Sequence, residues 1–95
     1  MQYDMVSIVA PTFNSMRTFD LFFWAITRQN YPHEYMEIIF ADGGSTDGTL
    51  EKIEKYKKNT EIKISVFHNP LRTAEAGKAV GVKKAKGGNM PVRFG

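Results

Sequence analysis

The residues best suited to chemistry stand where an apolar segment runs into a polar turn. Asp42 directly follows the apolar residues 36–41, and Gly43, Gly44 and Ser45 come next. Glycine allows close backbone approach to a ligand, and a strand-end carboxylate can accept hydrogen bonds from a ribose or a base edge. The pattern predicts a nucleotide contact at Asp42, although Asp-Gly-Gly-Ser is equally suited to a tight turn into a capped helix.

Other familiar site patterns are absent or incomplete. The glycine pair is not the G-x-G-x-x-G of dinucleotide-binding folds, and no G-x-x-x-x-G-K-[ST] phosphate loop occurs. His33 and His68 have no second ligand at a spacing typical of metal sites, and Ser45 is not in a nucleophile elbow. Because the chain has no cysteine, a disulfide framework or a cysteine zinc site is excluded.

Three short apolar segments are expected to form the strands that position these residues. They are rich in β-branched residues and are bounded by turn residues. The segments are residues 5–10, 36–41 and 62–67. The first should stop at Pro11, because proline cannot donate a hydrogen bond within a sheet.

Helical patterns fill the stretches that follow each strand. Apolar residues recur at helical spacing in residues 16–29, where Trp24 and the phenylalanines around it are expected in the core. Asp47 is a candidate N-cap for a second helix, and the small side chains of residues 73–86 should let a third helix lie close to a sheet. The order βαβαβα predicts an α/β fold with a parallel sheet, flanking helices and right-handed crossovers.

In an open parallel sheet, ligands bind outside the carboxyl ends of the strands. Three loops of this chain follow strands and should therefore meet at one edge. They are residues 11–15, 42–49 and 68–73.

Three ordered blocks of residues resemble family 2 glycosyltransferases. The first reads Val-Ser-Ile-Val-Ala-Pro-Thr-Phe-Asn at residues 6–14, the second covers 29–32 and 37–49, and the third ends a helix with Ala-Lys-Gly at 85–87. The resemblance implies a GT-A fold, whose first half is a Rossmann-like nucleotide-binding unit. It identifies residues 1–87 as the nucleotide-sugar-binding half of such a domain.

The resemblance also implies a donor-nucleotide site. The first loop of such enzymes lies against the nucleotide, the strand-end aspartate contacts the base or ribose, and a basic residue after the third strand helps to hold the nucleotide. The corresponding residues of this chain are Pro11, Thr12, Asn14, Asp42, Gly43 and Arg72.

The chain departs from the family's pattern at its end. Residues 88–95 form a divergent tail where the family would run through a fourth strand into an Asp-x-Asp motif, and no Asp-x-Asp occurs. That motif binds Mg²⁺ or Mn²⁺, which neutralises the diphosphate leaving group. We expect the intact enzyme to use this ion, and the present chain to be a truncated part that binds no metal and lacks the general base.

The implied activity is transfer of a sugar from a UDP-, GDP- or dTDP-sugar to a hydroxyl of a glycan or lipid acceptor. The alternative is a non-catalytic nucleotide-binding or regulatory module of the same fold.

The net charge of +3 would suit nucleic acid, but no exposed aromatic residues are expected among the lysines after residue 77, so no nucleic-acid partner is expected. Since no signal peptide or membrane-spanning segment is found, we expect a cytoplasmic location, and the intact protein could lie at the inner face of a membrane.

Overall fold

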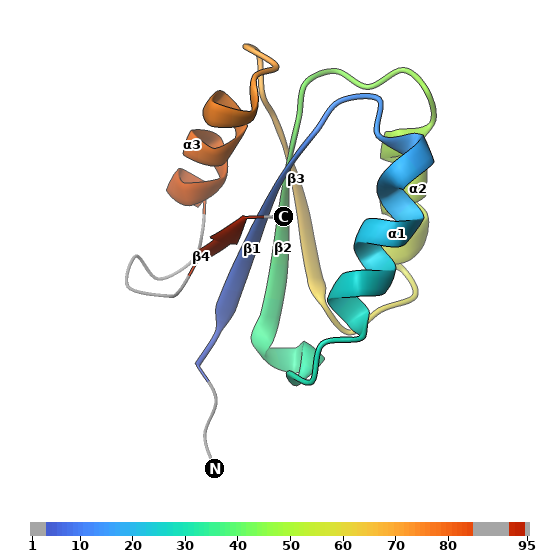
Figure 1. Ribbon diagram of the computed structural model, residues 1–95, viewed down its shortest axis with the longest axis vertical. Helices are drawn as coiled ribbons and strands as arrows, with labels where there is room; N and C mark the ends of the chain where they lie inside the picture. Colours follow the sequence, from blue (N-terminus) through green and yellow to red (C-terminus); the bar gives the residue numbers. More distant parts are fainter. Residues whose placement is uncertain (1–3, 85–91, 95) are drawn as a thin grey trace.

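A parallel sheet forms the centre of the structure, a computed structural model that describes residues 4–84 and 92–94 (Figure 1). Within these residues the strand order is β3-β2-β1-β4, and every neighbouring pair is parallel. The strands are β1 (Val6–Thr12), β2 (Met36–Asp42), β3 (Lys63–His68) and β4 (Val92–Phe94). The predicted α/β class with a parallel sheet is confirmed.

Helices cover both faces of this sheet. As Figure 1 shows, α1 (Met16–Thr27) and α2 (Thr49–Lys57) lie on one face, and α3 (Ala74–Lys84) lies on the other. A short 3-10 helix, η1 (His33–Tyr35), precedes β2. No helix within the described ranges is long and apolar enough to cross a membrane.

The fourth strand was not predicted from the sequence. Val92–Phe94 pairs with residues 7–9 of β1 inside the tail that was expected to diverge from the family. Three residues are too few to show the alternation by which a strand is recognised. The rest of that tail, 88–91 and 95, lies outside the described residues.

The first strand runs through Pro11 and ends at Thr12, so the predicted stop was wrong. Along β1, Pro11 aligns with Ala41 of β2, whereas β4 pairs only with residues 7–9. Beyond residue 9 one side of β1 therefore has no partner within the described strands, and proline is tolerated at such an edge.

The main core lies between the sheet and the helices α1 and α2. Phe19 packs against Phe40 of β2 and Tyr56 of α2, with ring centroids 5.5 and 5.4 Å apart. The buried members of the core are mostly large apolar residues of β1, α1 and β2. They are Val6, Ile8, Ala10, Phe19, Phe23, Ile26, Met36, Ile38, Phe40, Ile53, Ile62 and Ile64.

Trp24 does not belong to this core, so that prediction was wrong. Its side chain is 55% exposed, and the Arg28 guanidinium carbon lies 4.5 Å from the centre of its ring. A helix turns about 100° per residue. Trp24 therefore lies on the side of α1 that faces away from the sheet, while Phe19 and Phe23 lie on the side that faces it.

Two glycines, and not the alanines that were expected, let α3 lie close to the sheet. A Cβ added at Gly81 would lie 2.1 Å from Val9 Cγ1, and one at Gly77 would lie 2.8 Å from Pro11 Cβ. Both distances are shorter than any van der Waals contact. The backbone of α3 can therefore contact the end of β1 only where side chains are absent.

Candidate nucleotide-binding site

The carboxylate of Asp42 is the centre of a hydrogen-bond cluster at the end of β2. Its Oδ1 accepts from the hydroxyls of Thr12 and Ser45, at 2.8 and 2.6 Å. Its Oδ2 accepts from the backbone N–H groups of Gly44 and Ser45, at 2.9 and 2.8 Å. A carboxylate offers about four lone-pair positions, so all of them are used within the protein.

These hydrogen bonds hold Asp42 in its charged form. Burial of this side chain, which is 3% exposed, would by itself raise its pKa. The hydrogen bonds from Ser45, Thr12 and Gly44 outweigh burial, and the pKa of Asp42 falls below its ordinary value. The end of β2 therefore carries a fixed negative charge at neutral pH.

The first and second loops are tied together beside this carboxylate. The backbone N–H of Asn14 donates to Ser45 Oγ at 2.8 Å, and Asn14 Oδ1 accepts from the N–H of Thr46 at 2.8 Å. The loops are therefore held in one arrangement before any ligand binds.

Asp47 connects the starts of the two helices behind these loops. Its carboxylate accepts from the N–H of Met16 at 3.1 Å and from the N–H of Thr49 at 3.0 Å. The N-cap position of α2 is Gly48, so the prediction that Asp47 is the N-cap was wrong by one residue. Asp47 accepts from the N–H of Thr49 from the position before the N-cap.

Arg72 brings the third loop to the same edge. A Cβ added at Gly43 would lie 2.9 Å from Arg72 Cγ, and the Arg72 guanidinium carbon lies 4.8 Å from the centre of the Phe13 ring. Asn69 fixes the base of this loop, since its N–H donates to the Asp42 carbonyl at 2.7 Å and its carbonyl accepts from the N–H of Arg72 at 3.2 Å.

Two residues of the predicted site have unusual backbone angles. Asn14 and Arg72 have φ values of 47° and 61°, and no other non-glycine residue in the described ranges has a positive φ. Asparagine tolerates this region, but arginine there costs about 1–3 kcal/mol. Strain of this kind is retained mainly where it positions a functional group.

Four of the six predicted site residues are linked by direct contacts, namely Thr12, Asp42, Gly43 and Arg72, and Asn14 joins them through Ser45. Pro11 lies at the same edge, where it packs against Gly77 of α3. Their contacts with a nucleotide stay predictions.

Sequence reasoning missed three members of this cluster. Ser45 was placed in the turn after Asp42 and rejected as a nucleophile but was not predicted as a site residue, and Phe13 and Asn69 were not singled out. Ser45 links Asp42 to Asn14, which lies 31 positions before Ser45, and a single sequence gives no sign of such a contact.

The described residues do not fit the divalent cation that the GT-A fold implies. No group of three or more His, Cys, Asp or Glu side chains gathers within residues 4–84 and 92–94. Both oxygens of Asp42 are taken by internal donors. No step that depends on a metal is therefore derived from these residues.

Comparison with known proteins decides the family. The model of glycosyl transferase family 2 matches residues 7–88. The chain belongs to glycosyl transferase family 2. The match covers β1 to α3 and includes every predicted site residue.

Two curated relatives from this family illustrate the likeness. The chain is 35% identical over 85 residues to a dolichyl N-acetyl-alpha-D-glucosaminyl phosphate 3-beta-D-2,3-diacetamido-2,3-dideoxy-beta-D-glucuronosyltransferase of Methanococcus voltae, covering 88% of this chain and 26% of that protein. It is 28% identical over 81 residues to the poly(ribitol-phosphate) beta-N-acetylglucosaminyltransferase TarS of Staphylococcus aureus, covering 85% of this chain and 14% of that one.

Solved structures of TarS share the fold. The crystal structure of S. aureus TarS 1-349 in complex with UDP superposes with a TM-score of 0.75 and 24% identity, covering 95% of this chain and 27% of that chain. The structure of TarS 1-349 alone gives a TM-score of 0.73 and 25% identity over the same shares. The chain thus spans between about one seventh and about one quarter of the length of these family 2 relatives.

Proposed function

We propose that this chain forms the donor-nucleotide site of a glycosyltransferase that moves a sugar from a nucleotide-diphosphate sugar to a hydroxyl acceptor. The observation that carries the proposal is the cluster around Asp42, where three loops that are distant in sequence meet at the carboxyl edge of the sheet. This edge is where open α/β sheets bind ligands.

The chemistry of the cluster suits a nucleoside diphosphate. The hydroxyls of Thr12 and Ser45 can turn, so a ribose hydroxyl or base N–H can replace either one as a donor to Asp42. The fixed backbone N–H groups of Gly44 and Ser45 keep the carboxylate in place during this exchange.

Arg72 and Phe13 supply the complementary groups. Phe13 is 42% exposed and offers a ring face for a base, and the Arg72 guanidinium above it offers donors for a phosphate. The strained backbone of Arg72 supports a role in binding over a role in folding.

The identity of the donor is part of the proposal. A relative of the same fold was solved in complex with UDP, so UDP is the first nucleotide to test, with GDP and dTDP beside it. In the intact enzyme Mg²⁺ or Mn²⁺ would neutralise the diphosphate. Its ligands, like the general base and the site for a glycan or lipid acceptor, would come from residues beyond this chain.

Calorimetric titration with UDP, GDP and dTDP, each with and without Mn²⁺, tests the proposal. We expect saturable binding of one nucleotide, little changed by Mn²⁺. The variant Arg72→Gly should weaken it, because glycine fits the positive φ and removes only the side chain. The charge-matched control Arg17→Gln, on the outer side of α1, should bind as the parent does. The proposal would be contradicted if both variants lost the same nucleotide affinity, or if the folded chain bound none of the three nucleotides.

The second candidate is a nucleotide-binding module without catalysis. It rests on the same cluster around Asp42, which offers groups for a nucleotide whether or not sugar transfer follows. Sugar-transfer assays on the longest natural form of the protein distinguish the two, since only the first candidate predicts turnover.

A further inference from the structure

The outer side of α1 presents two apolar residues between two arginines. Leu21 and Trp24 are 68% and 55% exposed. Arg17 lies one turn before Leu21, and Arg28 lies one turn after Trp24, and both arginines are exposed. At about 100° per residue these four side chains fall within about 60° of the helix circumference. We call them the α1 stripe. The buried residues of α1 lie on the opposite side and are Phe19, Phe23 and Ile26.

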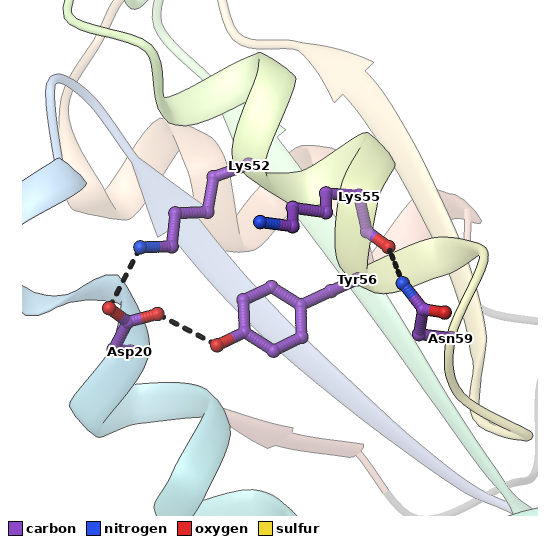
Figure 2. A pocket seen from close by; sticks show the side chains of 5 residues that line it. All are labelled: Asp20, Lys52, Lys55, Tyr56 and Asn59. Carbon is purple, nitrogen blue, oxygen red and sulfur yellow. Dashed lines mark hydrogen bonds and ion pairs between the residues drawn. The ribbon is translucent and has the colours of Figure 1, made fainter.

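The only carboxylate of α1 is compensated. Asp20 accepts from Lys52 Nζ at 2.8 Å and from the Tyr56 hydroxyl at 2.7 Å, as Figure 2 shows. No unpaired negative charge therefore stands on this helix beside the α1 stripe.

A hollow beside Asp20 adds positive charge to the same side of the molecule. It has a volume of about 330 Å³ and is lined by Asp20, Lys52, Lys55, Tyr56 and Asn59. Within the described residues the Lys55 ammonium makes no hydrogen bond or ion pair, and Figure 2 shows that Lys55 lines the hollow together with Tyr56.

The helix pair as a whole is basic. With its C-cap residue, α1 carries two arginines and one aspartate, a net charge of +1. With its C-cap residue, α2 carries four lysines and the exposed Glu51 and Glu54, a net charge of +2. Both helices therefore favour an anionic partner.

We propose that the α1 stripe docks on a membrane surface that contains anionic lipid. Leu21 and Trp24 would enter the interface, while Arg17, Arg28 and Lys55 would meet lipid phosphates. Exposed leucine and tryptophan supply the apolar contact by which a helix binds at a membrane interface, and the arginines beside them supply the attraction to anionic lipid. This inference does not depend on the proposed nucleotide site.

A protein partner fits the stripe less well. A stable protein interface buries about 800 Å² on each side, and two apolar side chains on a convex helix provide far less. A lipid surface needs no matching shape, and it gains from each basic residue near it.

The chain contains a single tryptophan, so its fluorescence reports directly on Trp24. The folded 95-residue chain is titrated with vesicles of phosphatidylcholine, with and without phosphatidylserine. We expect a blue shift of the emission and protection from acrylamide only with phosphatidylserine. Each basic residue near an anionic surface changes binding about fivefold, so the double variant Arg17→Gln, Arg28→Gln should bind about 25-fold more weakly.

The matched control removes the same charge on the other face of the sheet, through Lys78→Gln and Lys83→Gln on exposed parts of α3. It should bind much more tightly than the double arginine variant. Three results would overturn the inference for chains shown by circular dichroism to be folded. The first is an emission spectrum that does not shift with phosphatidylserine vesicles, and the second is an equal loss of vesicle affinity in both double variants. The third is an emission shift that follows protein concentration without vesicles, which would mean that a second copy covers Trp24.

Discussion

Replacing Asp42 by asparagine should destabilise the fold, because this carboxylate accepts four hydrogen bonds at the junction of two loops. Asparagine has nearly the same shape, so packing around residue 42 is kept. The change removes the charge and turns one acceptor oxygen into a donor.

The size of the effect follows from those four bonds. Hydrogen bonds to a charged group contribute about 1.5–3 kcal/mol and neutral ones about 0.5–1.5. The carbonyl of asparagine can still accept from Gly44 and Ser45, so each of these two bonds weakens by about 1 kcal/mol. The hydroxyls of Thr12 and Ser45 must turn to accept from the new amide. We expect a loss of about 2–3 kcal/mol, a large part of the 5–15 kcal/mol typical of a whole domain.

The loss should depend on pH in a defined direction. The pKa of Asp42 is lowered in the folded state, mainly by hydrogen bonds that outweigh its burial. Its stabilisation is therefore fully present above the unfolded pKa of about 3.9 and disappears as pH falls through the folded value. Parent and variant should differ by a constant amount above about pH 5, and the difference should begin to shrink as pH falls below about pH 4.

Urea unfolding followed by circular dichroism, repeated between pH 3 and pH 7, measures this difference. The control is Asp4→Asn, since Asp4 is exposed; its unfolding should match that of the parent. If Asp42→Asn stays within about 0.5 kcal/mol of the parent at neutral pH, the carboxylate is not the centre of the cluster and the reasoning fails.

Three further predictions concern other contacts. Gly81→Ala should destabilise by about 1–3 kcal/mol because its methyl group would meet Val9; a gain of about 1 kcal/mol, the usual effect in a helix, would show that α3 does not lie this close. Arg72→Gly should leave stability unchanged or raise it, while nucleotide affinity falls about ten- to hundredfold; unchanged affinity in calorimetry would remove Arg72 from the site. Tyr56→Phe should raise the pKa of Asp20 toward its ordinary value, since hydrogen bonds from Lys52 and then Tyr56 lower it. Titration of the Asp20 carboxyl followed by NMR measures this pKa, and an unchanged value would contradict the hydrogen bond from Tyr56.

Much of the fold follows from local sequence patterns. The β-branched segments and the helical spacing between them identified β1, β2, β3 and the three helices, because each element buries enough residues to leave a pattern. The short strand β4 leaves no such pattern, and the exposure of Trp24 depends on which side of α1 meets the sheet.

The candidate site was predictable in position but not in its internal contacts. Parallel strands place Thr12, Asp42 and Arg72 at one edge, so alternation of elements was sufficient to group them. The bridge from Asn14 to Ser45 and the stacking of Arg72 on Phe13 join residues more than 30 positions apart. Such contacts depend on the loops' final geometry, which local propensity does not fix.

The most direct test of the account is to map where UDP binds, using backbone amide shifts of the isotope-labelled chain. The account predicts saturable shifts at Phe13, Gly43, Gly44, Ser45 and Arg72, and none along the outer side of α1. Shifts centred on the hollow between α1 and α2, or no shifts from the folded chain at saturating UDP, GDP or dTDP, would contradict a donor-nucleotide site at the carboxyl edge of the sheet.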